Sequence, residues 1–197
     1  MIDTILLNLI KMLTERKVLN IENESKNYKK LIDQKSDKNI FKIKSDYNSD
    51  IYHIMFIYGK LTTIKKIQDI DLFFENSKKD NRIFIGENIN QKTYKQFLEY
   101  KNTEVFFDYE LLINVIDHNL QPKFEVLSSS DIENLHKSYI LDNKDIPIML
   151  TTDRIARYYK LKDGDIVRII RSSITSGYIT SYRIVRDGDI KVLFKFT

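Results

Sequence analysis

The segment Glu99-Tyr100-Lys101 contains the residue types that come closest to a catalytic motif in this chain. Metal-dependent nucleases often place an aspartate on one strand and Glu-x-Lys on the next, so that the carboxylates converge on a cation. Here the tripeptide ends a segment of helical periodicity, and residues two apart on a helix do not share a face. A match this short also arises by chance, so we predict no catalysis at this position.

The residues that other chemistries need are scarce. The chain has no cysteine, and its three histidines, His53, His118 and His136, lie far apart in the sequence. These facts exclude a disulfide framework and a thiol nucleophile, and they argue against a zinc site. His53 lies in an apolar run, where a histidine is more often a hydrogen-bonded core residue than a ligand. We predict no catalytic residue, no metal and no cofactor, so the chain by itself is not an enzyme.

The charge is modestly basic, with a formal net charge of +4 and a pI of about 9.0. This suits a nucleic acid partner, although many ordinary soluble proteins carry as much charge. Lys92 and Lys95 lie where a loop after an apolar strand enters a helix, and backbone N–H groups favour phosphate at such a position. We predict these two lysines as DNA-binding residues. The lysine pairs elsewhere are more typical of solvated faces.

The first half of the chain must position these lysines, and its hydrophobic periodicity indicates alternating strands and helices. Apolar residues at helical spacing from Ile2 to Leu13 predict an amphipathic helix. We expect buried strands at 51–58 (ended by Gly59), 82–86 and 104–107, and helices at 61–74 and 93–100, the latter with Tyr94, Phe97 and Leu98 facing inward. Strands that alternate with helices predict a small α/β layer with parallel pairing.

The second half begins with a helix start signal. Ser130-Asp131-Ile132-Glu133 matches the capping box, and Ile132, Leu135 and Tyr139 would share one face of the helix that follows. Residues 146–150 read as extended, and Thr152 or Asp153 would cap a short helix ending near Tyr159. We expect strands at 166–171, 178–185 and 190–196, the last two joined by a hairpin at Asp187-Gly188.

The apolar runs are too short to span a bilayer, and the first helix lacks the basic region and cleavage site of a signal peptide. We therefore expect an intracellular soluble protein with no membrane partner and no small-molecule substrate. Basic and aromatic residues gather between Arg154 and Arg171. They either lie over a small sheet without a partner or dock on another subunit, since tyrosine and arginine are enriched in interface cores. Composition leaves both readings open.

Three anchors in the second half resemble a known family. Ile146-Pro147, Asp153 and Ala156-Arg157-Tyr158-Tyr159 resemble its Leu-Pro, Asp-Pro and Ala-Arg-Tyr-Phe/Tyr signature. Gly164 to Arg171 resembles its Gly-x-Val-Val-Lys-Ile-Ile-Arg strand. Its Ser-x-Thr-x-Gly and Tyr-Arg-Leu-Val positions are matched by Ser173, Thr175, Gly177, Tyr182, Arg183 and Val185. The family is the fifth-largest subunit shared by the eukaryotic nuclear RNA polymerases, which is related to the H-type subunit of archaeal RNA polymerase.

The extent of the resemblance indicates the eukaryotic form. Residues 110–122 resemble the linker between the family's two domains, whereas the archaeal protein is similar only to the second domain. The resemblance implies an α+β protein with a small N-terminal α/β jaw domain, residues 1–117. It also implies a C-terminal α+β assembly domain with a short mixed sheet, residues 118–197.

The resemblance further implies a non-catalytic subunit of a multisubunit DNA-directed RNA polymerase. Its second domain would dock on the largest subunit, and its jaw would lie beside the downstream double-stranded DNA. The implied subunit-interface residues are Pro147, Arg157, Tyr158, Tyr159, Gly164, Arg168, Arg171, Gly177, Tyr182 and Arg183. A stand-alone basic nucleic-acid-binding protein is the alternative, and a nuclease is the third possibility.

Several positions depart from the family pattern. Arg154, Lys160, Ser172 and Ile174 replace its usual Pro, Gly, Pro and Glu. Only Lys95 matches the jaw's Thr-Pro-Ser-Ala-Lys loop, and the chain continues past Val185. A composition rich in Ile, Asn and Lys suggests an AT-rich genome, such as that of a protist or a large DNA virus. We expect a nuclear protein if the gene is cellular, and one of the host cytoplasm and virion if it is viral.

Overall fold

The structure is a computed structural model that describes residues 1–34, 39–67, 70–117, 121–139, 144–173, 175 and 177–194. The chain divides into two compact units, Met1–Ile113 and Asn114–Thr197. Among the described residues, each unit combines helices with a four-stranded sheet, so the predicted α+β class is confirmed. The domain boundary predicted between residues 117 and 118 lies four residues after the division between these two units, and it stays a prediction.

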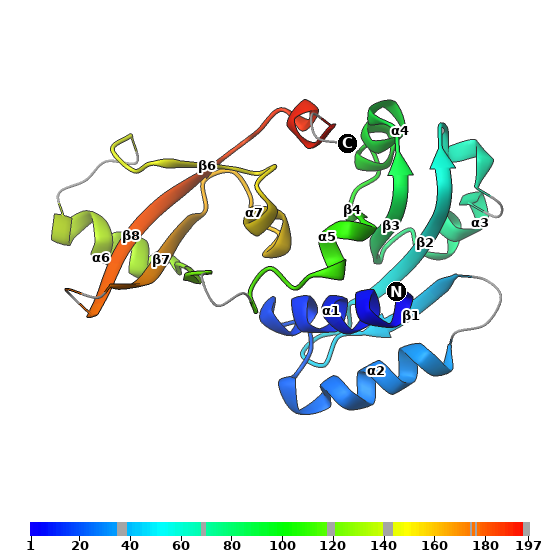
Figure 1. The fold of residues 1–197 in the computed structure, drawn as a ribbon, viewed down its shortest axis with the longest axis horizontal. Coiled ribbons are helices and arrows are strands. Elements are labelled where there is room, and N and C mark those ends of the chain that lie inside the picture. Colours follow the sequence, from blue (N-terminus) through cyan, green and yellow to red (C-terminus); the bar gives the residue numbers. More distant parts are fainter. Residues whose placement is uncertain are drawn as a thin grey trace. The chain divides into compact units, whose positions relative to one another are not determined.

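The N-terminal unit is built around a sheet whose strands follow one another in sequence order (Figure 1). The strands are β1 (Ile40–Lys44), β2 (Ile51–Leu61), β3 (Asn81–Ile89) and β4 (Thr103–Phe107). β3 pairs in parallel with both β2 and β4, which confirms the predicted parallel layer. β1 is an edge strand that pairs antiparallel with β2, and it was not predicted from the sequence.

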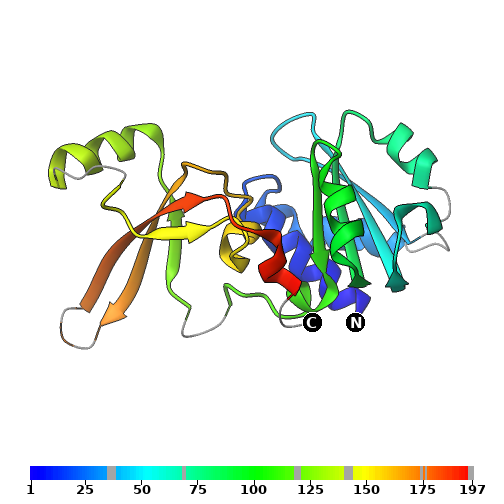
Figure 2. The same ribbon diagram turned by 90° about the horizontal axis from the view of Figure 1, so that it is seen from above.

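Helices cover both faces of this sheet, with α1 and α2 on one side and α3 and α4 on the other (Figure 1, Figure 2). The α-helices are α1 (Ile2–Glu15), α2 (Glu24–Asp33), α3 (Ile70–Asn76), α4 (Gln91–Leu98) and α5 (Asp108–Leu112). Two 3-10 helices, η1 (Ile21–Asn23) and η2 (Ile64–Lys66), lie between them. Because parallel crossovers are right-handed, α3 and α4 come to lie on the same face.

The central strand β3 packs against helices on both of its faces. Phe84 is fully buried, and its ring centroid lies 5.4 Å from that of Phe73 in α3 and 4.3 Å from that of Phe97 in α4. Successive side chains of a strand alternate between faces, so Ile83 and Ile85 point the other way, toward the α1 side. A strand covered on both faces is continuously apolar, as was predicted here.

The predicted end of β2 at Gly59 is wrong. The strand continues to Leu61 after a shift in its pairing with β3 between Ile57 and Lys60. Gly59 has a φ of +69°, a left-handed conformation that glycine adopts readily, and it accommodates the irregularity.

The helix predicted over 61–74 is also wrong in its first part, where the end of β2 and η2 replace it and the α-helix begins only at Ile70. The helix predicted over 93–100 is present as α4 and buries Tyr94 and Phe97. Leu98 was expected to face inward, but it is the last residue of α4 and is 40% exposed.

The C-terminal unit has a smaller sheet with the strand order β5-β7-β8-β6. Its strands are β5 (Lys123–Val126), β6 (Ile148–Leu150), β7 (Ile166–Ser173) and β8 (Gly177–Arg186). β7 pairs antiparallel with β5 and β8, whereas β6 pairs in parallel with β8, so the sheet is mixed. The helices are α6 (Ser129–Tyr139), α7 (Arg154–Tyr158) and the 3-10 helix η3 (Ile190–Phe194).

Two small cores lie on opposite faces of this sheet. On one face Val167 and Val185 pack against Ala156 of α7. On the other face their sequence neighbours Ile166 and Ile184 pack against Leu135 of α6. Farther along, the β7–β8 hairpin is open to solvent, and Tyr178 is 75% exposed.

The capping box of α6 lies two residues earlier than predicted. Ser128 caps this helix in place of Ser130, and its Oγ accepts a hydrogen bond from the N–H of Asp131 at 3.3 Å. In return, the Asp131 carboxylate accepts from the N–H of Ser128, also at 3.3 Å. An aspartate thus supplies the reciprocal bond that we had assigned to Glu133. The side chain of Tyr139 lies outside the described residues.

The strand predicted over 190–196 is wrong, because the chain after β8 forms the 3-10 helix η3 instead. No hairpin forms at Asp187-Gly188 within the described residues. The N–H of Gly188 donates to Oγ1 of Thr151 at 3.0 Å, and that of Asp187 donates to Oδ1 of Asp163 at 3.2 Å. These bonds tie the segment to the loops on either side of α7. Residues 195–197 lie outside the described part.

Candidate partner interface

The helix α7 is short and held at both ends. Asp153 is its cap rather than Thr152, because Oδ1 of Asp153 accepts a hydrogen bond from the N–H of Ile155 at 2.8 Å. The helix buries Ile155, Ala156 and Tyr158. The exposed fraction of Tyr158 is only 5%, so this residue shapes the unit from within its core.

The end of α7 is a Schellman motif centred on Lys160. The N–H of Leu161 donates to the carbonyl of Ala156 at 2.8 Å, and the N–H of Lys160 donates to the carbonyl of Arg157 at 3.1 Å. Lys160 has a φ of +55°, in the left-handed region that favours glycine. Lys160 therefore holds a position whose backbone conformation is unfavourable for lysine and favourable for glycine.

Arg168 of β7 lies at the centre of a charged group on the α6 face of the sheet. Its Nη1 lies 3.4 Å from Oε2 of Glu125, and Nζ of Lys123 lies 2.9 Å from Oε1 of the same carboxylate. The hydrogen bond from Lys123, together with the charges of Lys123 and Arg168, holds the pKa of Glu125 below its usual value against a smaller effect of burial.

Arg168 and Tyr182 face each other across the β7–β8 pair. The Arg168 guanidinium lies 6.0 Å from the centre of the Tyr182 ring. Both side chains line a polar depression together with the α6 residues Asp131, Asn134, Leu135 and Ser138. Two residues that the resemblance implied as interface therefore share one accessible surface.

Arg183 points to the opposite face and reaches the edge strand β6. Its Nη1 donates to the carbonyl of Ile148 at 3.0 Å. Pro147 is exposed just before this strand, so the structure brings Pro147 and Arg183 together. Beside them lies a groove lined by Ile148, Met149, Leu150, Thr152, Asp153, Arg183 and Val192.

The remaining residues that were implied as interface do not join into one patch. Arg157 and Tyr159 are half-buried near α7, and Arg171 is exposed opposite Ile179 on the open hairpin. Gly164 and Gly177 have φ values of +92° and +74°, with open space where a Cβ would be, so they serve turns. The ten residues are thus distributed over both faces of the C-terminal sheet.

Lys92 lies in the first turn of α4 and Lys95 in its last turn, three residues apart, and both are exposed. Asn90 caps this helix, with its Oδ1 accepting a hydrogen bond from the N–H of Thr93 at 2.7 Å. The cap thereby takes up one of the donors that a phosphate would use. The two ammonium groups remain accessible from solvent.

The residues of the nuclease motif are surface groups. Glu99 ends α4 as its C-cap, and both Glu99 and Lys101 are exposed. Within the described ranges, no three His, Cys, Asp or Glu side chains gather as metal ligands would. The structure gives the motif no site.

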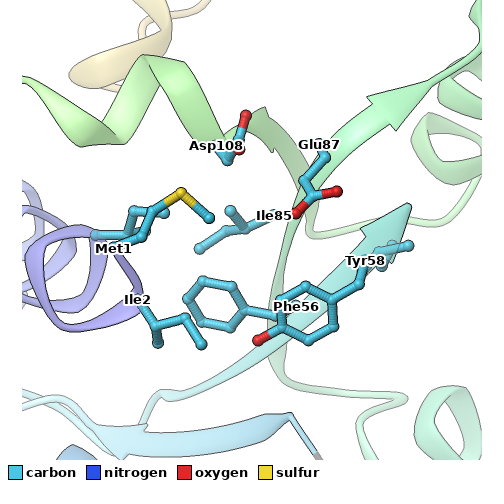
Figure 3. A pocket seen from close by; sticks show the side chains of 9 residues that line it. Met1, Ile2, Phe56, Tyr58, Ile85, Glu87 and Asp108 are labelled. Carbon is cyan, nitrogen blue, oxygen red and sulfur yellow. The ribbon is translucent and has the colours of Figure 1, made fainter. Parts of the chain in front are cut away.

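Glu87 and Asp108 flank a small cavity of the N-terminal unit (Figure 3). Apolar side chains, including those of Met1, Phe56 and Ile85, line it. Oε2 of Glu87 accepts from the N–H of Gly59 at 3.0 Å, and Oδ1 of Asp108 accepts from the N–H of Tyr109 at 2.7 Å. The cavity volume is about 10 Å³, which is too small for a substrate.

A buried ion pair was not anticipated from the sequence. Arg16 at the end of α1 forms a two-pronged contact with Glu104 of β4, with Nη1–Oε1 and Nη2–Oε2 distances of 3.1 and 2.9 Å. The exposed fractions of the two side chains are 4% and 14%. The sequence feature that could have indicated this pair is Glu104, the one charged residue of the apolar strand predicted over 104–107. The pairing of Glu125 with Arg168 was missed as well, although residues 123–126 alternate polar and apolar types.

In the part of the chain that the structure describes, no helix has the length and apolarity needed to cross a bilayer.

Comparison with known proteins gives a consistent family. The model of the RNA polymerase Rpb5 C-terminal domain matches residues 113–185. DNA-directed RNA polymerase subunit 5 of Acanthamoeba polyphaga mimivirus is 32% identical over 190 residues, which cover 93% of this chain and 91% of that protein. The DNA-directed RNA polymerases I, II, and III subunit rpabc1 of Dictyostelium discoideum is 27% identical over 185 residues, covering 89% and 92%. DNA-directed RNA polymerase subunit 5-like protein 1 of Arabidopsis thaliana is 40% identical over 80 residues, covering 41% and 38%.

Proposed function

The chain belongs to the RNA polymerase Rpb5 family, and on this premise we propose that it is a non-catalytic subunit of a multisubunit DNA-directed RNA polymerase. The observation that carries the proposal is the similarity to the mimivirus subunit, which covers 93% of the chain and so runs through both units. A match to the C-terminal domain alone would have been compatible with a shorter, archaeal type of subunit.

In this proposal, residues 118–197 form the assembly module and dock on the largest subunit. The accessible arginine and tyrosine side chains of the C-terminal unit support this, because these types are enriched in interface cores. They are Arg157, Tyr159, Arg168, Arg171, Tyr182 and Arg183, which are distributed over both faces of the sheet, and Pro147 is exposed near Arg183. Tyr158, Gly164 and Gly177 would act indirectly, by holding the helix and the turns that position these side chains.

Co-purification tests the docking role. A tagged chain isolated from its native source should bring down the largest polymerase subunit. The double variant Arg168→Ala with Tyr182→Ala should bring down less of it, because both side chains leave the same surface. If wild-type chain carries nucleic acid but no polymerase subunit, the alternative of a stand-alone nucleic-acid-binding protein is correct instead.

Residues 1–117 would form the jaw beside the downstream duplex, with Lys92 and Lys95 binding phosphates. Such binding is independent of base sequence and weakens as the salt concentration rises, because it is driven by the release of counterions from the DNA. In the intact enzyme, Lys92→Ala with Lys95→Ala should reduce duplex retention at low salt. The slope of log K against log salt should become shallower by about 0.9 for each phosphate that is no longer neutralised.

Lys29→Ala with Lys30→Ala is the matched control, since these exposed lysines lie on α2, on the other side of the sheet. An unchanged salt slope for the Lys92 and Lys95 variant would show that these residues do not bind the DNA.

The relatives include a viral protein and cellular ones. We propose that the chain is nuclear if its gene is cellular, and that it lies in the host cytoplasm and the virion if its gene is viral. Antibody labelling of the native source distinguishes these locations.

A further inference from the structure

The groove beside β6 is an apolar surface at the edge of the C-terminal sheet. Ile148, Leu150 and Val192 line it and are 56%, 40% and 38% exposed. These are large apolar side chains in one depression, and such clusters on a soluble protein mark interaction sites.

One wall of this groove comes from a segment beyond the family's C-terminal domain. The domain match ends at residue 185, whereas Val192 belongs to η3. The segment is seated firmly on β6 through Gly188, where a Cβ would lie 2.7 Å from Oγ1 of Thr152 and 3.1 Å from Cβ of Leu150. Only glycine allows this close approach. The groove is therefore built jointly by the domain and by its extension.

The backbone of β6 is poorly suited to pairing with another strand. The carbonyl of Ile148 accepts from Arg183, and the carbonyl of Leu150 accepts from the N–H of Asp153 at 2.9 Å. An edge strand whose acceptors are already used resists strand addition. An occupant of the groove must therefore bind through side chains.

A second copy of this chain is also a poor occupant. Strand pairing, by which two copies of a sheet edge commonly associate, is closed to it because the outward acceptors of β6 are already used. The guanidinium of Arg183 has five N–H donors, and one of them donates to the carbonyl of Ile148. Among the described residues, Arg183 forms no ion pair with a carboxylate. The groove thus offers apolar surface next to a guanidinium that suits an acid, while its own carboxylate, Asp153, already accepts from the N–H of Ile155.

We infer that this groove binds an apolar segment of another polymerase subunit, and that a carboxylate beside that segment pairs with Arg183. The inference rests on the proposed function, because it supposes that the chain joins a polymerase. The contact goes beyond the docking surface proposed above, because one wall of the groove comes from the extension after residue 185.

Full-length variants test the groove in the assembled enzyme. Ile148→Glu and Val192→Glu each place a charge on one wall, and each should lower retention of the subunit in the polymerase by about tenfold, the factor that a loss of 1.4 kcal/mol produces. Val126→Glu is the matched control, since Val126 is 47% exposed on β5, at the opposite edge of the same sheet. It should be retained like wild type, and circular dichroism should confirm that all three variants are folded.

A photo-cross-linker in place of Val192 identifies the occupant, and the expected product joins this chain to another polymerase subunit. A cross-link to a second copy of the chain would overturn the inference. Normal retention of Ile148→Glu and Val192→Glu in an enzyme that contains the wild-type chain would also overturn it, and would leave the proposed function intact. Absence of the wild-type chain from the polymerase would contradict the proposed function itself.

Discussion

The two sheets of this molecule are covered to different extents. In the N-terminal unit, helices lie on both faces, and the largest fully buried side chains among the described residues all lie between Ile5 and Phe107. In the C-terminal unit, β8 starts with a run of exposed residues from Gly177 to Ser181, and its two cores are small. The first unit therefore has a larger internal core, whereas one end of the second unit's sheet lies uncovered.

The difference bears on how stability and binding are divided along the chain. A sheet buried on both faces gains its stability from packing within the unit. A two-stranded hairpin without cover is only marginally stable in water by itself. Substitutions in the first unit should therefore act mainly on folding, and those in the second mainly on assembly.

The largest effect is expected at the centre of the covered sheet. Phe84→Ala removes a fully buried ring that contacts both α3 and α4, so the free energy of unfolding should fall by about 3–5 kcal/mol. Denaturant titration followed by circular dichroism measures it. Phe124→Ala is the counterpart on β5, where the side chain is only half-buried, and its loss should be clearly smaller. Equal losses would contradict the contrast between the units.

The next effect concerns the two ion pairs. Glu104→Gln leaves the buried guanidinium of Arg16 without its counter-charge and should destabilise the first unit by about 3 kcal/mol. Glu125→Gln breaks the more exposed contact with Arg168 and should cost at most about 1 kcal/mol. Thermal unfolding reports both. The double variant Arg16→Met with Glu104→Leu should recover most of the loss, because no uncompensated charge remains.

A smaller gain is expected at the left-handed helix ends, which occur in both units. Lys17 after α1 has a φ of 57° and the same Schellman bonds as Lys160 after α7. Lys17→Gly and Lys160→Gly should each stabilise the protein by about 1 kcal/mol, because glycine adopts this conformation without steric conflict. Calorimetry should show a higher melting temperature for each. Lys162→Gly, outside the left-handed positions, should show no gain.

The smallest effect is on acid sensitivity. A hydrogen bond from the N–H of Asn20 lowers the pKa of Asp46 in the first unit, and the contact with Lys123 lowers that of Glu125 in the second. Each carboxylate therefore stabilises the folded state above its unfolded pKa, near 4, and this contribution is lost as pH falls through the lower folded pKa. Asp46→Asn and Glu125→Gln should each flatten the loss of stability below about pH 4 in its own unit.

NMR of amides in each unit measures the two effects separately. A variant whose acid response matches wild type would show that its carboxylate is not linked to folding.

The strands of the first unit could be predicted because burial on both faces leaves a continuous apolar run, as in Ile83-Phe84-Ile85. The edge strand β1 was missed although Phe41 to Lys44 alternates apolar and polar residues, because the surrounding stretch is polar and rich in lysine. The cap of α7 was predicted as Thr152 or Asp153, because a cap and the N–H that it binds lie within three residues, and the structure selects Asp153.

What could not be predicted depends on contacts between distant residues. Asp187-Gly188 has the local signature of a hairpin, but Gly188 is held by Thr151, far earlier in the chain. The groove depends on the same contact, because it brings Val192 beside β6. The sequence thus predicted which residues could form the candidate interface. That these residues lie on both faces of the C-terminal sheet could be learned only from the structure.

The left-handed lysine at position 160 has a consequence for the gene as well as for the helix. The non-glycine residues with positive φ in the described chain are Lys17, Asn39, Asn102 and Lys160. Lysine and asparagine codons begin with two adenines, whereas glycine codons begin with two guanines. In a gene rich in A and T, codon changes at a left-handed position would therefore favour lysine or asparagine over glycine. At position 160 the lysine side chain holds the helix end in a conformation that glycine would adopt without steric conflict.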